Sequence, residues 1–149
     1  MQNWTHVLIH HSASPDHDGL DFDEIRKYHL NVNNWQDIGY HFLMEQADGM
    51  VIVVQGRPLT MTGAHSPGMN DKAIGVCVVG NFEITEPSPT IIEALVDRVL
   101  VPQCRIWNIP AVNIHGHRDH RKTLCPGEHL YNALPAIRIM VETELAKSK

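Results

Sequence analysis

Residues 73–80, which read AIGVCVVG, are small or apolar throughout. Continuous apolar sequence of this kind is typical of a strand buried on both faces, whereas a half-exposed strand alternates apolar and polar residues. We therefore predict a central strand with a layer of structure on each side. A chain of 149 residues fits one domain with a sizeable core, so we expect a single domain over residues 1–149.

Four other segments extend the predicted sheet. Residues 5–11 form an apolar, partly β-branched run, and residues 113–115 have the character of a short edge strand. Residues 38–45 and 50–55 flank an Asp-Gly pair at 48–49, which is a strong hairpin signal. Because a hairpin is antiparallel, we expect a mixed rather than a fully parallel sheet.

Three segments have the apolar spacing of amphipathic helices. The first follows Asp21, a suitable N-cap, and ends before the asparagines at 31–34. The second opens at Ser88 and Pro89, and Pro102 should kink or end it. The third begins near Leu130. The sequence thus predicts an α/β fold in which a central mixed β-sheet is flanked by α-helices.

Charge and composition exclude several classes of partner. The net charge of −5, without a polybasic run, argues against nucleic acid as the main partner. No apolar run reaches the ~20 residues of a membrane helix, so we expect no membrane association. The N-terminal residues lack the basic and apolar regions of a signal peptide, so we expect the chain to be cytoplasmic as synthesised. Three widely spaced cysteines make a disulfide framework unexpected.

The 11 histidines are many for this length and suggest metal or proton-transfer chemistry. Residues 115–127 (HGHRDHRKTLCPG) bring together three of them and a cysteine. Imidazole nitrogen and thiolate sulfur are zinc ligands, and a catalytic zinc site has three protein ligands with a fourth position left for water. This loop can supply two ligands, and a third must come from elsewhere in the chain.

Two alternatives compete with a zinc site in this loop. Cys125 could simply be a small buried side chain in a polar loop, which is the usual place of a free cysteine. Cys125 and His117 could instead form the nucleophilic pair of a thiol hydrolase. The H-E-x-x-H pattern of zincins and the H-x-E with P-C-x-x-C pattern of deaminases are both absent.

The remaining histidines differ in their expected roles. His10 and His11 point to opposite faces of their strand, so at most one of them faces any given site. His41 lies inside the strand expected at 38–45 and is expected to be a hydrogen-bonded structural residue. His65 lies in the Gly- and Pro-containing loop 63–70, where functional residues concentrate.

Five ordered motifs resemble those of the zinc-dependent N-acetylmuramoyl-L-alanine amidases, a family that includes phage lysozymes of the amidase kind, muropeptide-recycling amidases and animal peptidoglycan recognition proteins. The motifs are residues 8–14 (LIHHSAS), 35–42 (WQDIGYHF), 63–65 (GAH), 73–82 (AIGVCVVGNF), and 116–119 (GHRD) followed by 125–127 (CPG).

The resemblance implies one Zn²⁺ ion in a surface cleft, held by His10, His117 and Cys125. It implies hydrolysis of the amide bond between N-acetylmuramic acid and L-alanine of the stem peptide. Tyr40 matches a family tyrosine to which we assign general acid/base or oxyanion support. Thr123 stands where many phage members have lysine, and we expect this neutral residue to assist catalysis and tune the rate.

The loop 63–70 provides the two residues that we expect to bind substrate, His65 and Asn70. The expected partner is peptidoglycan or a muropeptide, and we expect a monomer. We favour a phage or prophage endolysin that acts on the cell wall after release. The alternatives are a cytoplasmic muropeptide-recycling amidase, a non-catalytic peptidoglycan-binding module of the same fold and, more remotely, a thiol-dependent peptidase.

Overall fold

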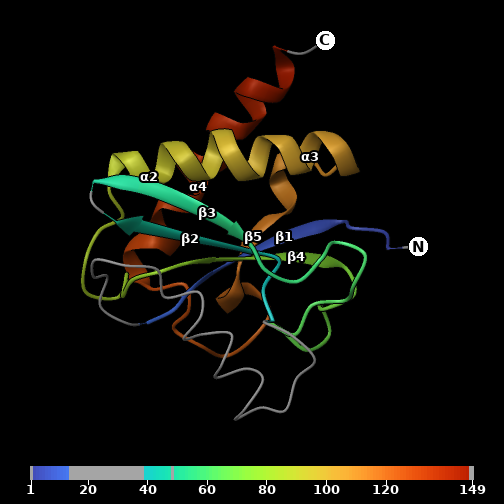
Figure 1. Ribbon diagram of the computed structural model, residues 1–149, viewed down its shortest axis with the longest axis horizontal. Coiled ribbons are helices and arrows are strands. Elements are labelled where there is room, and N and C mark those ends of the chain that lie inside the picture. Colours follow the sequence, from blue (N-terminus) through green and yellow to red (C-terminus); the bar gives the residue numbers. More distant parts are fainter. Residues whose placement is uncertain (1, 14–38, 48, 148–149) are drawn as a thin grey trace.

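A five-stranded sheet forms the centre of the protein (Figure 1). The computed structural model describes residues 2–13, 39–47 and 49–147. The strand order is β3-β2-β4-β1-β5. The strands are β1 (His6–His11), β2 (Phe42–Ala47), β3 (Met50–Gln55), β4 (Ala73–Val78) and β5 (Ile114–Gly116).

The pairing of the strands confirms the mixed sheet. β1 lies between β4 and β5 and is parallel to both, and β2 is parallel to β4. β2 and β3 form the antiparallel hairpin expected from the Asp-Gly signal. All six residues of β4 are buried, as predicted for a central strand, and β5 lies at the edge of the sheet.

Helices cover one face of the sheet (Figure 1). Helix α2 (Pro89–Ala94) continues into a π-helical segment (Leu95–Leu100) and then into α3 (Val101–Trp107). The long C-terminal helix α4 (Glu128–Ala146) packs against the same layer. Short 3₁₀ turns occur at Ala111–Asn113 and His117–Asp119. No helix among the described residues is long and apolar enough to cross a membrane.

Ser88 starts α2 as predicted, because its side-chain oxygen accepts a hydrogen bond from the Ile91 N–H at 3.1 Å. The sequence predicts that Pro102 kinks or ends this helix. The predicted end does not occur, because helical structure continues to Trp107. A π-helical segment precedes Pro102 and resets the hydrogen-bond pattern. Pro102 then stands in the first turn of α3, where an α-helix leaves its N–H groups unpaired and a proline is tolerated. The helix predicted after Asp21 lies outside the described residues.

Alternation along the strands gives the two faces of the sheet different chemistry. On β1, Val7 and Ile9 belong to the large apolar core beneath the helices. His6, Leu8 and His10 therefore point to the opposite face. The same alternation places Gly75 and Cys77 of β4 on that second face, and His10 is the register partner of Cys77. The second face thus carries the histidines and cysteines that are candidates for chemistry.

Candidate metal centre

Three residues far apart in sequence meet at the end of β1. They are His10 on β1, His117 at the start of a 3₁₀ turn and Cys125 in the following loop, and their ligand atoms all lie within 4.8 Å of one another. Cys125 Sγ is 3.7 Å from His10 Nδ1, and the His10 and His117 ring centroids are 4.4 Å apart. Within the described part of the chain, no other group of three potential ligands is this close.

His11 faces away from this group, as strand geometry predicts. Its Nδ1 atom accepts a hydrogen bond from the Phe82 N–H at 3.1 Å on the helix side of the sheet. Its backbone N–H nevertheless points at the site and lies 3.4 Å from Cys125 Sγ. The His11 side chain therefore anchors the loop after β4, while its main chain contacts the candidate sulfur ligand.

A chain of hydrogen bonds fixes the orientation of the His10 ring. His65 Nε2 is 2.9 Å from the Ala73 carbonyl oxygen, and His65 Nδ1 is 2.9 Å from His10 Nε2. A carbonyl can only accept, so Nε2 of His65 carries the proton and Nδ1 of its neutral ring accepts. His10 Nε2 is then the donor, which leaves a free lone pair on His10 Nδ1. That lone pair is on the nitrogen nearest to Cys125 Sγ.

Two glycines make room for the buried His65 ring. A Cβ atom at Gly63 would lie 2.5 Å from the His65 ring, and a Cβ atom at Gly75 would lie 2.6 Å from it. The His65 and Ser66 N–H groups both donate to Asn70 Oδ1, at 2.8 and 2.7 Å. These contacts use both nitrogens of His65 and the Asn70 side-chain oxygen. The structure thus gives His65 and Asn70 a supporting role behind His10, and their expected contact with substrate stays a prediction.

The loop that carries His117 and Cys125 is closed by its own hydrogen bonds. The Arg118 N–H donates to the Cys125 carbonyl oxygen at 2.9 Å, and Asp119 Oδ2 accepts from the Gly116 N–H at 3.0 Å. Tyr131 on α4 donates its hydroxyl to Asp119 Oδ1 at 2.5 Å. Arg118 and Asp119 thus pin the loop.

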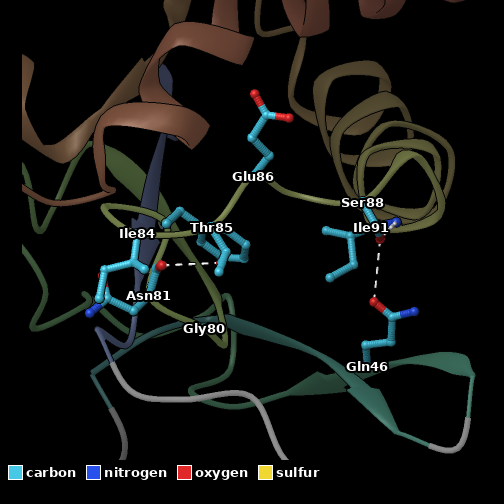
Figure 2. A pocket seen from close by; sticks show the side chains of 9 residues that line it. Gln46, Gly80, Asn81, Ile84, Thr85, Glu86, Ser88 and Ile91 are labelled. Carbon is cyan, nitrogen blue, oxygen red and sulfur yellow. Dashed lines mark hydrogen bonds between the residues drawn. The ribbon is translucent and has the colours of Figure 1, made fainter.

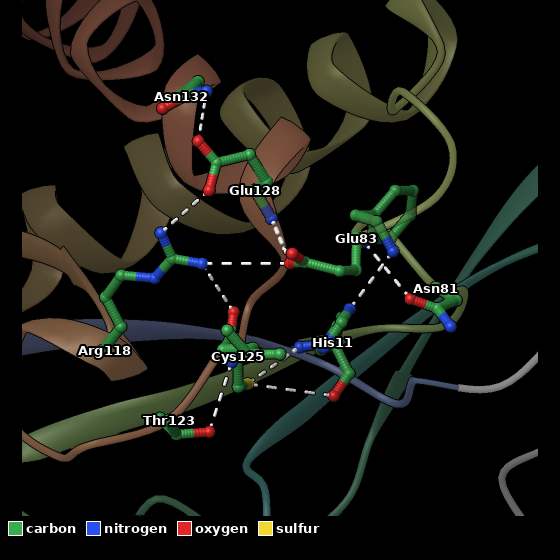
Figure 3. Close-up of polar contacts among 10 residues, drawn as sticks. His11, Asn81, Glu83, Arg118, Thr123, Cys125, Glu128 and Asn132 are labelled. Atoms are coloured by element: carbon green, nitrogen blue, oxygen red, sulfur yellow. Dashed lines mark hydrogen bonds and ion pairs between the residues drawn. The ribbon is translucent and has the colours of Figure 1, made fainter.

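The Arg118 guanidinium ties this loop to the start of α4 (Figure 3). It donates to the Leu124 carbonyl oxygen at 2.9 Å and lies 3.3 Å from a Glu128 carboxylate oxygen. Glu83 approaches the same guanidinium at 3.9 Å and accepts from the Glu128 N–H at 2.8 Å. Through Glu83, these contacts join the loop after β4 to the loop before α4. The latter loop carries Cys125.

Gly127 permits the close approach of these two loops. Its φ angle of +92° lies in the region that favours glycine, and a Cβ atom there would lie 2.4 Å from the Phe82 backbone. Position 127 therefore requires glycine both for the positive φ angle of the turn and for the close contact with the Phe82 backbone.

Cys125 is a neutral thiol unless a metal ion replaces its proton. Burial raises the pKa of its thiol to about 11, so a free thiol stays protonated at neutral pH. The Cys125 N–H donates to Thr123 Oγ1 at 3.2 Å. A hydroxyl that accepts one hydrogen bond can still donate one, which leaves Thr123 able to act as a donor beside the site.

The two histidines of the group are held in the neutral form. Burial, reinforced by His65 and His117, keeps the pKa of His10 well below its usual value. Burial also lowers the pKa of His117, with Arg121 and His120 acting in the same direction. Neutral imidazoles with an available lone pair and a thiol that can lose its proton to a metal form the donor set of a zinc site. The residues therefore fit a zinc ion.

Tyr40 lies next to the group, and its ring centroid is 5.1 Å from that of His10. Burial raises the pKa of its hydroxyl well above 10, and contact with Cys77 adds to the effect. Tyr40 and Cys77 share a side-chain hydrogen bond. The sequence marks Cys77 only as part of a buried strand, and no local signal places its sulfur against Tyr40.

His41 has the structural role that the sequence suggested. Its Nε2 atom donates to the Met61 carbonyl oxygen at 3.0 Å, and its Nδ1 atom accepts from the Gly75 N–H at 3.0 Å. This bridge holds the segment before β2 against β4, next to the slot that holds His65.

A separate cavity of about 410 Å³ lies beyond the end of β4 (Figure 2). It is bounded by Gln46 on β2, by the segment 80–86 and by Ser88 and Ile91 at the start of α2. None of the three candidate ligands lines it, so this cavity is distinct from the His10 site.

Comparison with known proteins agrees with this arrangement. Residues 1–128 match the family described as N-acetylmuramoyl-L-alanine amidase. The chain belongs to this family.

Two curated members of the family illustrate the similarity. The chain is 32% identical over 138 residues to the N-acetylmuramoyl-L-alanine amidase of Sus scrofa, covering 86% of this chain and 22% of that protein. It is 31% identical over 132 residues to peptidoglycan-recognition protein LB of Drosophila melanogaster, covering 85% of this chain and 56% of that protein. The amidase chain thus spans only part of the length of these relatives.

Solved structures of the family share the fold. The bumblebee protein PGRP-SA superposes with a TM-score of 0.80 at 27% identity, covering 91% of this chain and 82% of that chain. The N-acetylmuramoyl-L-alanine amidase LysC from Clostridium intestinale URNW gives a TM-score of 0.77 at 28% identity, covering 91% and 85%. These matches confirm the mixed sheet flanked by helices that the resemblance implied.

The buried histidines of this amidase domain should make its stability depend on pH. Burial lowers the pKa of His41 to about 4 and that of His65 to about 3. Because the unfolded chain binds these protons near pH 6.5, stability should be complete above pH 6.5 and fall as the pH drops toward 4. The loss at pH 4 should be about 3 kcal/mol per histidine. Urea unfolding of metal-free protein between pH 7 and pH 4 measures it.

The variant His41→Gln provides the matched control. Glutamine can donate to Met61 and accept from Gly75 without titrating, so this variant should lose the His41 share of the pH dependence. Equal pH dependence in the variant and in the original protein would contradict the assignment.

Proposed function

We propose that this chain is a zinc-dependent amidase that hydrolyses the bond between N-acetylmuramic acid and L-alanine in peptidoglycan. The observation that carries the proposal is the meeting of His10, His117 and Cys125 at the end of β1, with all ligand atoms within 4.8 Å. Membership of the N-acetylmuramoyl-L-alanine amidase family gives this donor set its chemical context.

His10 Nδ1, His117 and Cys125 Sγ would hold the zinc ion. When bound, zinc polarises the amide carbonyl and makes water an effective nucleophile near neutral pH. The protein contributes a fixed His10 tautomer, through His65 and Ala73, and a loop held in place by Arg118. Both contributions reduce the reorganisation that the reaction requires.

Tyr40 and Thr123 are the side chains proposed to act on the substrate. The Tyr40 ring lies beside the His10 ring, and the raised pKa of its hydroxyl keeps it protonated. It supports the negative charge that develops on the amide oxygen. Thr123 adds a neutral donor next to Cys125. Loss of one such donor costs about 2.7–4 kcal/mol of transition-state stabilisation in other hydrolases.

A non-catalytic peptidoglycan-binding module is the second candidate. It is favoured by similarity to recognition proteins, including a point mutant of Drosophila PGRP-LB in complex with tracheal cytotoxin, at 28% identity and a TM-score of 0.79. A binding module has no need for a complete donor set. The presence of Cys125 together with both histidines and Tyr40 supports the enzyme.

Within this activity we propose the role of a phage or prophage endolysin. The chain resembles the endolysin N-acetylmuramoyl-L-alanine amidase LysCS from Clostridium intestinale URNW, at 28% identity and a TM-score of 0.75. The short gap of eight positions between His117 and Cys125 also supports this choice over a recycling amidase. Such an enzyme is made in the cytoplasm, reaches the wall after release and works as a monomer.

The role of zinc is tested by the variant Cys125→Ala. The original protein should hold one zinc per chain and release peptides with free N-terminal L-alanine from purified sacculi. The variant should lose stoichiometric zinc and at least about 100-fold of this activity, the scale of losing one preorganised group at a reaction centre. Metal analysis and end-group analysis, with and without chelator, give both readouts.

The variant Cys104→Ala is the matched control, because Cys104 is a buried cysteine of α3 outside the site and its loss should leave zinc content unchanged. Activity that resists chelator but is blocked by alkylation would indicate a thiol hydrolase instead. Absence of stoichiometric zinc from the original protein, or full activity of Cys125→Ala, would refute the proposal.

The support of His10 by His65 is tested through zinc affinity. His65→Ala removes the acceptor of the His10 N–H and should weaken zinc binding by about 10–100-fold. His65→Gln should restore most of the affinity, since an amide oxygen can accept from His10 while its nitrogen donates to Ala73. Competition with a chromophoric chelator measures both. Equal zinc affinity of His65→Ala and the original protein would show that His65 does not orient His10.

The endolysin role is tested by the choice of substrate. The protein should lower the turbidity of intact sacculi faster than it cleaves soluble anhydro-muropeptides at matched bond concentration. Both rates should vanish in Cys125→Ala, which controls for contaminating hydrolases. Preference for the soluble fragments would identify a recycling amidase and overturn the endolysin role without affecting the proposed chemistry.

A further inference from the structure

A second cluster of histidines lies on the same face of the sheet as His10, at the other end of β1. It consists of His6 on β1, His115 on β5 and His120 just after the 3₁₀ turn. His115 Nδ1 is 2.8 Å from His120 Nε2, and these two rings stack with centroids 5.1 Å apart. All three side chains are partly exposed, so solutes can reach them.

The main chain fixes the tautomer of His115 in this cluster. His115 Nε2 is 3.1 Å from the Val112 carbonyl oxygen, which can only accept, so this nitrogen carries the proton. His115 Nδ1 is then unprotonated and accepts the hydrogen bond of the His120 Nε2–H. A metal ion placed between these two nitrogens would take the place of that proton, and His120 would then carry its proton on Nδ1. A carbonyl behind one nitrogen of an imidazole is the usual support for a histidine whose other nitrogen binds a metal.

His6 is placed to supply a third ligand. Its ring centroid is 5.1 Å from that of His115 and 6.2 Å from that of His120. His6 Nδ1 is held by the Thr5 hydroxyl at 2.8 Å, which leaves Nε2 to coordinate. Parallel pairing of β1 with β5, in which Leu8 is the partner of His115, keeps these rings on one side of the sheet.

We propose that His6, His115 and His120 form a second metal site, for a borderline divalent cation such as Zn²⁺, Co²⁺, Ni²⁺ or Cu²⁺. Neutral imidazole selects these ions over Mg²⁺ and Ca²⁺, which prefer oxygen ligands. The inference is independent of the proposed amidase activity, because none of these three side chains belongs to the His10 site.

The second site should bind its ion more weakly than the first. Two nitrogens on one zinc ion lie about 3.3 Å apart, given Zn–N bonds of about 2.0–2.1 Å, so the His115–His120 pair must open slightly. The His6 ring must also turn inward, since the three ligand atoms are not yet as close as those of the first site. The positive charges of Lys72 and Arg138 act on His6 and His115 and oppose a cation, whereas the Asp119 carboxylate acts on His115 in the opposite sense.

A metal ion in this second site should affect metal binding at the His10 site. His115 on β5 and His120 after the 3₁₀ turn lie on either side of His117 in the sequence. The His120 N–H donates to the His117 carbonyl oxygen at 3.0 Å. An ion that joins His115 to His120 therefore restrains the segment that carries His117.

Titration of metal-free, untagged protein with Co²⁺ distinguishes the two sites. The first equivalent should give the sulfur-to-cobalt charge-transfer band of a site that contains Cys125. A second, weaker equivalent should add d–d absorption without further charge transfer, as expected of an all-imidazole site. The double variant His6→Ala/His120→Ala should lose the second transition and keep the first.

His129→Ala is the matched control, because His129 is a partly exposed histidine at the start of α4 and should not affect either transition. Binding of only one equivalent, or a second transition that survives His6→Ala/His120→Ala, would overturn the proposal. The first outcome would leave His115 and His120 as a hydrogen-bonded pair, and the second would assign the extra ion to other histidines. Absence of the charge-transfer band would count against the Cys125 site alone.

Discussion

The hydrogen bond between His65 and His10 is the interaction on which the candidate metal centre depends. An imidazole can present its lone pair at either nitrogen, and the Ala73 carbonyl decides the choice for His65 and, through it, for His10. Because Ala73 belongs to the central strand β4, the most buried part of the sheet sets the tautomer of a residue on the neighbouring strand. The main chain of the sheet, rather than a group on the solvent side, therefore fixes the orientation of the His10 ring.

This arrangement explains why small residues occur where they do on β4. Gly75 faces the His65 ring and donates its own N–H to His41, so any side chain there would displace one histidine and disturb the other. A mid-strand glycine weakens a strand by losing side-chain packing. Here that cost is offset because the space is filled by the ring of His65, which supports His10.

The sheet could be predicted from the sequence because its signals are local. Alternation in β1 separates His10 from His11, the continuous apolar run marks β4, and Asp-Gly marks the hairpin. The contact between His65 and His10 spans 55 residues and depends on how the loop 63–70 folds over β4, for which no local pattern exists. The sequence therefore marks the glycine-containing loop of His65 as functional, but it could not show that the His65 ring is buried behind His10.

The second face of β1 also explains how one chain can keep two histidine clusters apart. His6 and His10 point the same way, and four residues of strand place them about 13 Å from each other. Leu8, which is fully buried, lies between them on that face. The segment after β5 serves both ends, since it carries His115 and His120 to one cluster and His117 to the other. Of the two clusters, only the one at His10 includes a cysteine, so the two proposed sites would differ in affinity by the chemistry of their donors as well as by their geometry.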